Sequence, residues 1–135
     1  YGTPKEYVEQ QLKAGKDVLL EIEMQGGMLV KKQFPDAMLV FVTPPSAEIL
    51  KDRLTGRGTE SAEEIERRLH RASEEADFMK QYDYILVNDE MEKTVRRLGQ
   101  IIHGNRYSRN SMKAFMESYL ESEIHSDLAD VIRSL

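Results

Sequence analysis

Residues 17–42 read DVLLEIEMQGGMLVKKQFPDAMLVFV, and this stretch decides the fold class. Residues 17–23 and 37–42 are apolar for most of their length, which is typical of strands that are buried on both faces. The segment between them, residues 25–32, predicts a short helix that Pro35 ends. A strand, a helix and a second strand in this order predict a right-handed βαβ unit in a parallel sheet, and therefore an α/β fold.

Helix signals lie on both sides of this unit. Thr3-Pro4-Lys5-Glu6 matches the capping-box pattern and predicts a helix that extends to residue 14 and ends at Gly15. Ser46 can cap a helix over residues 46–54, and Ser61 begins a second capping box, followed by a long charged helix to residue 80. Gly56-Arg57-Gly58 between these two helices predicts a flexible turn, as expected for the hinge of a lid.

The C-terminal part of the chain predicts a further strand and further helices. Residues 84–87 (YILV) are typical of a third strand, and Asp89 can cap a helix that ends near His103. Beyond Asn105, apolar residues recur at helical spacing and predict an amphipathic tail whose role the sequence does not define. These apolar residues are Met112, Phe115, Met116, Tyr119 and Leu120.

The composition excludes several classes of protein. With 135 residues, 40% of them hydrophobic, the chain is expected to form one compact unit with its own core. It contains no cysteine, which excludes disulfides and is compatible with the cytoplasm. The net charge of -5 argues against a broad nucleic-acid-binding surface, and no apolar run approaches the roughly 18 residues of a membrane helix. We therefore expect a soluble protein that binds neither nucleic acid nor membrane.

Two glutamates, Glu21 and Glu23, are candidates for ligand binding. They are two residues apart in the predicted strand, so both side chains leave the same face. The C-terminal ends of parallel strands are common ligand sites, where carboxylates accept hydrogen bonds or assist in binding Mg²⁺. The alternative is that both are solvated charges at an exposed strand end, and spacing alone favours neither interpretation.

Five arginines surround the predicted Gly56-Arg57-Gly58 turn and are candidates for phosphate binding, because guanidinium groups match phosphate oxygens. The alternative is a solvated helix with ordinary i,i+4 ion pairs to Glu63 and Glu64. From the residues alone, this alternative is favoured. The five are Arg53, Arg57, Arg67, Arg68 and Arg71.

Two other common chemistries have no support in the sequence. No Gly-x-x-x-x-Gly-Lys-Ser/Thr segment is present, so the chain contains no phosphate-binding loop of the Walker A type. His70, His103 and His125 are scattered without the spacing of a metal site. We therefore expect no metal ion that is bound directly by the chain.

The order of the motifs along the chain is more specific than any one of them. From residue 1 to about residue 107, the chain resembles guanylate kinases of the bacterial type. The resemblance implies a parallel sheet of the P-loop kinase type, flanked by helices, with a helical lid and with the N-terminal part of the fold missing. The matching segments are Tyr1-Gly2-Thr3, Glu21-Ile22-Glu23-Met24-Gln25-Gly26, Pro44-Pro45-Ser46, Arg53, Gly56-Arg57-Gly58-Thr59, Arg68-Leu69 and Val87-Asn88-Asp89.

The resemblance also implies roles for individual residues. Tyr1 and Thr3 would bind the phosphate and the guanine of GMP, and Glu23 would accept hydrogen bonds from guanine N1 and N2. Glu21 would order a water on Mg²⁺, and Asn88 would lie beside the adenine of ATP. Both glutamates replace aspartates that are usual in the family, which lengthens each side chain by one methylene. The catalytic arginines of the lid, which would contact the nucleotide phosphates, are Arg53, Arg57 and Arg68.

The same resemblance divides the chain into five segments. Residues 1–7 would end the GMP-binding lobe, and residues 8–47 would belong to the α/β core. Residues 48–79 would form the lid and its flanking helices, and residues 80–107 would return a strand and a helix to the core. Residues 108–135 would form the C-terminal helical tail.

The implied function is transfer of the γ-phosphoryl group from MgATP to GMP by the intact protein in the cytoplasm, giving ADP and GDP. The family's phosphate-binding loop and most of its GMP lobe would precede Tyr1, so we expect this segment alone to be inactive. One alternative is a guanylate-kinase-like phosphopeptide-binding module without catalysis, and a weaker one is another nucleoside monophosphate kinase. The lid arginines and the strand carboxylates favour the guanylate kinase. Its partners would be ATP and GMP, and a homo-oligomer is compatible with the sequence.

Overall fold

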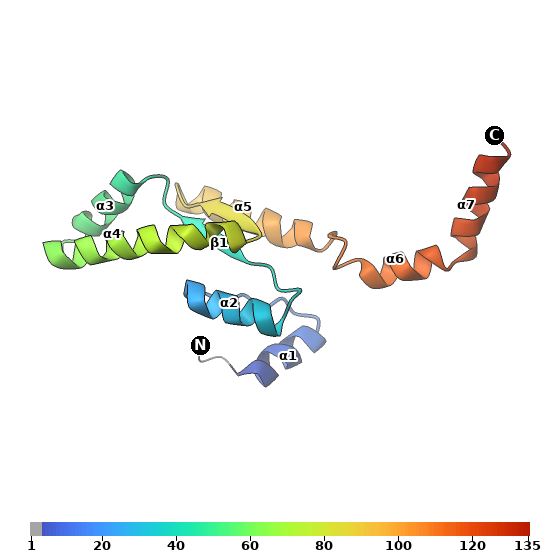
Figure 1. Cartoon of the computed structure of the whole chain (residues 1–135), viewed down its shortest axis with the longest axis horizontal. Helices are drawn as coiled ribbons and strands as arrows, with labels where there is room; N and C mark the ends of the chain where they lie inside the picture. The colour runs from blue at the N-terminus through green and yellow to red at the C-terminus, as the bar shows by residue number, and fades with distance from the viewer. Residues whose placement is uncertain (1–3) are drawn as a thin grey trace. The chain divides into compact units, whose positions relative to one another are not determined.

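The computed structural model describes residues 4–135 (Figure 1). The chain divides into two units, a first that ends at Ile85 and a second that covers Leu86–Leu135. The single compact unit expected from composition is therefore wrong, because α5 to α7 follow one another along the chain in a unit of their own. The elements, in order, are α1 (Lys5–Lys13), α2 (Met24–Gln33), β1 (Val40–Thr43), α3 (Ala47–Gly56), α4 (Ala62–Ala76), the 3-10 helix η1 (Asp77–Gln81), β2 (Tyr84–Val87), α5 (Met91–Asn105), α6 (Lys113–Leu120) and α7 (Glu123–Arg133).

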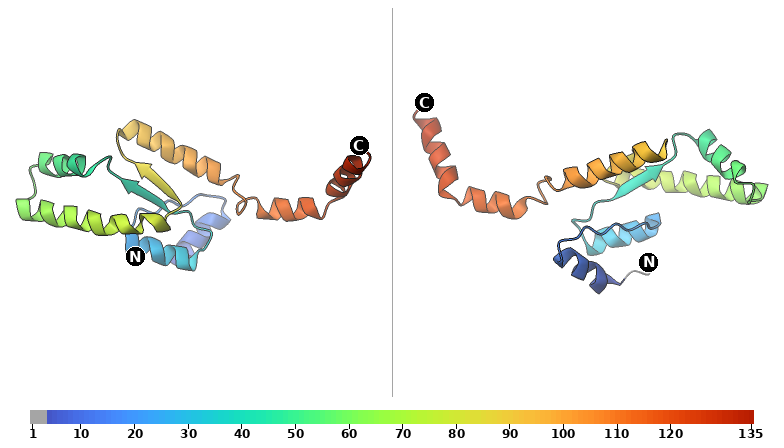
Figure 2. Two further views of the ribbon diagram at one scale, coloured as in Figure 1. Left: turned by 45° about the horizontal axis from the view of Figure 1, so that its top comes forward. Right: turned by 180° about the vertical axis from the view of Figure 1, so that it is seen from behind.

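The strands β1 and β2 form a small parallel sheet, which confirms the predicted α/β class (Figure 2). The backbone carbonyl of Leu39, just before β1, accepts hydrogen bonds from the N–H groups of Asp83 (2.9 Å) and Tyr84 (3.1 Å). The chain between the two strands forms α3, α4 and η1. The connection is therefore a helical crossover, which is the usual way to join parallel strands.

The strand predicted over residues 17–23 is wrong. Residues 16–23 have no regular secondary structure, and the side chain of Leu19 is 71% exposed. A strand forms when a neighbour satisfies its backbone N–H and C=O groups, and no strand in residues 4–135 pairs with this segment. The predicted βαβ unit over residues 17–42 is therefore absent, and the second strand of that prediction begins only at Val40.

The two helices that border the predicted lid turn begin where the sequence predicts. Ser46 Oγ accepts a hydrogen bond from the N–H of Ile49 (3.1 Å), and Ser61 Oγ accepts one from the N–H of Glu64 (3.2 Å). Such side chains satisfy N–H groups that have no partner within the helix. Gly58 follows α3 with a φ of +64°, a conformation that favours glycine. This turn brings α3 and α4 into contact with each other.

The remaining helices of the first unit lie close to their predicted positions. α1 begins at Lys5 with Pro4 at its N-cap, one residue later than predicted, and Thr3 lies outside the described residues. Gly15 follows α1 with a φ of +80°, so the predicted glycine stop is confirmed. The long helix predicted to residue 80 is formed by α4 and then by η1.

Tyr82 organises the packing of the first unit around α2 and β1. Its ring meets Phe41 edge to face, with ring centroids 5.2 Å apart. A Cβ added to Gly27 of α2 would lie 2.9 Å from the hydroxyl oxygen of Tyr82, so the absence of a side chain permits this close approach. Among residues 4–85, the buried apolar side chains are Val8, Val30, Leu39 and Leu54.

Asp83 connects three segments of the first unit. Its Oδ2 accepts a hydrogen bond from the N–H of Leu39 (2.7 Å) and lies 3.5 Å from Nζ of Lys31. Lys31 Nζ also donates to the carbonyl of Ala37 (2.6 Å). The network therefore fixes the start of β1 against α2 and against the segment that enters β2.

Asp83→Ala is expected to lower the free energy of unfolding by about 1–3 kcal/mol, because the buried N–H of Leu39 loses a charged acceptor. Chemical denaturation measures the change. Asp36→Ala, which removes an exposed carboxylate from the turn after α2, is the matched control. Equal losses of stability in the two variants would contradict a structural role for the Asp83 network.

The second unit begins within β2 and continues into α5. The predicted cap of α5 is wrong by one residue, because Glu90 occupies the N-cap position and its side chain makes no capping bond. The carboxylate of Asp89 instead accepts the N–H of Glu90 (2.7 Å) and pairs with Arg97 (3.0 Å), and these bonds, in that order, hold the pKa of Asp89 below its ordinary value. The Asp89 carboxylate is therefore bonded within the turn that precedes α5 and does not cap the helix.

The C-terminal tail contains two helices, α6 and α7, which follow each other with a short turn between them. Phe115 and Tyr119 lie one turn apart on α6, with ring centroids separated by 6.0 Å. Phe115, Met116 and Leu120 of α6 are exposed, so the packing of the predicted amphipathic tail stays a prediction. In the described part of the chain, no helix is long and apolar enough to cross a membrane.

Candidate functional site

Glu23 is held by an arginine from a distant part of the sequence. It is the N-cap residue of α2, and its Oε1 lies 2.8 Å from Nη2 of Arg71 in α4. Arg71 also donates through Nε to Glu75 Oε1 (3.1 Å). The hydrogen bond and charge of Glu23, followed by those of Glu75, hold the pKa of Arg71 above its ordinary value. The contact joins the beginning of α2 to the middle of α4.

Arg68 lies one turn before Arg71 on α4, and its ion-pair partner differs from the predicted one. Its Nη2 lies 2.8 Å from Oε1 of Glu60, which precedes the helix, whereas the sequence suggested a pair with Glu64. Residues three apart on a helix share a face, so Arg68 and Arg71 lie on the same side of α4. The suggested i,i+4 ion pair between Glu64 and Arg68 is therefore wrong.

The other two predicted catalytic arginines lie on the α3 side of the turn. Arg53 is in the last turns of α3, and Arg57 is the C-cap residue of that helix. Both side chains are exposed. Because α3 packs against α4, the structure places Arg53, Arg57 and Arg68 on two neighbouring helices joined by the Gly58 turn.

Two other predicted site residues that the structure describes, Glu21 and Asn88, lie outside α3 and α4. Glu21 is exposed in the irregular segment two residues before Glu23. Asn88 belongs to the second unit, where its Oδ1 lies 3.2 Å from the hydroxyl of the buried Thr94. Tyr1 and Thr3 lie outside the described residues. The structure therefore brings Glu23 to the lid helix α4, and it does not test the roles of Tyr1 and Thr3.

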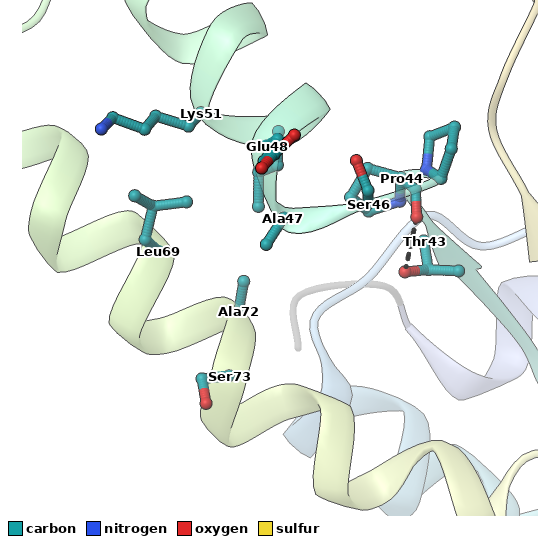
Figure 3. Close-up of a pocket in the computed structure, with 11 residues that line it drawn as sticks. Thr43, Pro44, Ser46, Ala47, Glu48, Lys51, Leu69, Ala72 and Ser73 are labelled. Atoms are coloured by element: carbon teal, nitrogen blue, oxygen red, sulfur yellow. Dashed lines mark hydrogen bonds between the residues drawn. The ribbon is translucent and has the colours of Figure 1, made fainter.

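A cavity of about 610 Å³ lies between the end of β1, the start of α3 and one face of α4 (Figure 3). Glu48 and Lys51 of α3 are on one side of it, and Leu69 lies opposite on α4. The Pro44-Pro45-Ser46 segment, which the sequence marks as a break, forms its end. None of the predicted site residues that the structure describes lines this cavity.

Two residues that contact the predicted site have no individual role in the sequence-based prediction. Arg71 belongs only to the arginine cluster of that prediction, and Glu60 is absent from it. The three-residue spacing between Arg68 and Arg71 was an available signal. No sequence signal indicates the pairing of Arg71 with Glu23, because 48 positions separate the two residues.

Comparison with known proteins identifies the family. A model of the family described as guanylate kinase matches residues 1–105 of the chain. The chain belongs to the guanylate kinase family. This confirms the resemblance recognised from the ordered motifs, including those in the α3–Gly58–α4 segment.

Curated guanylate kinases match across most of the chain. The guanylate kinase of Lactococcus lactis subsp. lactis is 52% identical over 107 residues, which are 79% of this chain and 52% of the relative. Those of Bacillus cereus and Bacillus anthracis are each 46% identical over 121 residues, which are 90% of this chain and 59% of each relative. The chain therefore spans between half and three fifths of the length of these guanylate kinases.

The described residues offer few side chains that could bind a metal ion. Among the residues that the structure describes, no group of three or more histidine, cysteine or acidic side chains is arranged to hold a metal ion. Glu21 offers a single exposed carboxylate. One carboxylate suits a Mg²⁺ ion that is held mainly by substrate phosphates and water, since Mg²⁺ keeps several waters in such sites.

Proposed function

We propose that the intact protein transfers the γ-phosphoryl group of MgATP to GMP, giving ADP and GDP. Membership of the guanylate kinase family supports this proposal. The observation that carries it is the contact between Arg71 and Glu23, because it ties the helix that carries Arg68 to the proposed guanine-binding carboxylate. Phosphoryl transfer requires both at one site, since it depends mainly on positioning and on stabilisation of charge.

In this proposal, the acceptor nucleotide is selected through Glu23. A carboxylate accepts hydrogen bonds from both N1–H and the N2 amino group of guanine, and adenine lacks this pair of donors. Tyr1 and Thr3 would complete the acceptor site at the phosphate and the base. Asn88 would contact the adenine of ATP.

The lid would act on the phosphates. Residues 48–79 include all but the first residue of α3, the Gly58 turn and α4, and their arginines would neutralise charge on the transferring group when the lid closes. The core would be residues 8–47 and 80–107, with residues 1–7 ending the GMP lobe and residues 108–135 forming a tail. The catalytic arginines in this proposal are Arg53, Arg57 and Arg68.

Mg²⁺ would enter with ATP and offset the negative charge of the phosphates. Glu21 is the residue of this chain proposed to order a water on that ion, because it is an exposed carboxylate close to Glu23 in sequence. The cytoplasm is the proposed location of the reaction, as the supply of ATP and GMP requires.

Acceptor selectivity tests the proposed function. The intact protein is expected to produce ADP from ATP rapidly with GMP and only slowly with AMP, measured in a coupled assay for ADP. Equal turnover with AMP would favour another nucleoside monophosphate kinase. A folded protein that shows no turnover but binds phosphorylated peptides would contradict the proposal in favour of the non-catalytic module.

Residues 1–135 alone are expected to form no GDP from ATP and GMP, because they contain no Walker A segment to bind the β- and γ-phosphates. The assay compares this segment with the intact protein at equal concentration, and circular dichroism confirms that both are folded. ATP-dependent GDP formation by the segment would show that the lid arginines suffice for phosphate binding.

A further inference from the structure

Glu60 is a nearly buried carboxylate in the turn between α3 and α4. It directly precedes Ser61, the N-cap residue of α4, and its side chain is only 11% exposed. Its Oε1 lies 2.8 Å from Nη2 of Arg68. Its Oε2 is buried and has no hydrogen-bond partner among the residues that the structure describes. Carboxylates are rarely buried unless they are paired, and Arg68 is the cation that pairs with this one.

Arg68 remains available to a ligand despite this contact. Its side chain is 54% exposed, and a guanidinium group carries five N–H donors, of which the Glu60 contact uses Nη2. The ion pair therefore restrains the side chain without enclosing it. A long side chain that is already restrained loses less conformational entropy when it binds.

The direction of the restraint also matters. A pair with Glu64 would hold Arg68 along the exposed surface of α4, whereas Glu60 lies beyond the N-terminal end of that helix. Glu60 thus draws the guanidinium group toward the turn that also contains Arg57. Two arginine charges at this end of the lid would suit phosphate oxygens.

We propose that Glu60 is a positioning residue that orients Arg68 toward the nucleotide phosphates. The inference rests on the proposed guanylate kinase function. Glu60 itself does not contact substrate in this proposal, and it acts only through the guanidinium group of Arg68.

A double-mutant cycle in the intact kinase tests this inference. Glu60→Gln is expected to lower kcat about tenfold, as loss of orientation at a reacting centre does, with little change in KM for GMP. The same substitution in an Arg68→Ala background is expected to change kcat by less than about twofold, because the residue through which Glu60 acts is already gone. Glu63→Gln, at an exposed position in the first turn of α4, is the matched control and should leave kcat unchanged.

The outcomes separate the inference from the proposed function. A tenfold loss of kcat in both backgrounds would show that Glu60 only supports the fold, and wild-type kcat for Glu60→Gln would show that it does not position Arg68. Either result overturns the inference while the kinase function stands. Absence of GMP-dependent turnover in the parent protein would overturn both. If Glu60→Gln does not fold, judged by its thermal midpoint, Glu60→Asp, which keeps the charge on a shorter side chain, takes its place in the cycle.

Discussion

Arg68→Ala in the intact protein is expected to lower kcat of the proposed reaction by about 10²–10³-fold, which is the usual effect of removing one donor that stabilises a transition state. The structure places Arg68 on α4 with its side chain more than half exposed, close to the turn of the proposed lid. Charge on the transferring phosphoryl group develops as the proposed reaction proceeds, so Arg68 would contribute more to the transition state than to the bound substrates. The loss should therefore appear in kcat, with KM for GMP changed little.

Arg67→Ala is the matched control for this experiment. Arg67 is the preceding residue of α4, is also exposed and carries the same charge, but it lies on a different face of the helix. Steady-state ADP production with saturating GMP measures both variants. A similar loss of kcat in Arg67→Ala would show that the total positive charge of α4 matters and that the position of Arg68 does not.

Glu23→Ala is expected to lower kcat/KM for GMP by about 10²-fold, because guanine would lose the charged acceptor of two hydrogen bonds. Activity with AMP should change much less, since adenine does not use this acceptor. The selectivity for GMP over AMP, measured as the ratio of the two kcat/KM values, should therefore fall by nearly the same factor.

The control for this second experiment is Glu63→Ala, which removes an exposed glutamate from α4. Glu75→Ala provides a further comparison, because it removes the other acceptor of Arg71 and leaves Glu23 in place. Both controls should retain the selectivity for GMP. If Glu23→Ala lowers activity with GMP and AMP equally, Glu23 supports the site without recognising guanine.

Local signals in the sequence predicted the elements around the proposed lid. Ser46 and Ser61 cap α3 and α4 as expected, because a hydroxyl acceptor needs only the N–H group three residues later. Gly58 lies in the turn between the helices, because glycine can adopt a positive φ without the steric cost of a Cβ. β2 likewise has the bounds predicted for the YILV run.

The prediction failed for residues 17–23, where the outcome depends on a partner. An apolar run has the composition of a buried strand, but strand formation requires hydrogen bonds to another segment. The sequence could not show that the described residues provide no such neighbour for this one. Leu19 and Ile22 are accordingly exposed, although their residue types are typical of a core.

The sequence by itself determined the family, the α/β class and the identity of the arginines and carboxylates that the proposed function uses. The order and spacing of residues suffice to predict these three features, because each feature depends on residue type and on local backbone preference. Only the tertiary structure decided which charges meet, pairing Arg71 with Glu23 and Arg68 with Glu60. An ion pair requires two side chains to come within a few ångströms, and for residues far apart in the chain the packing of helices and turns sets that distance.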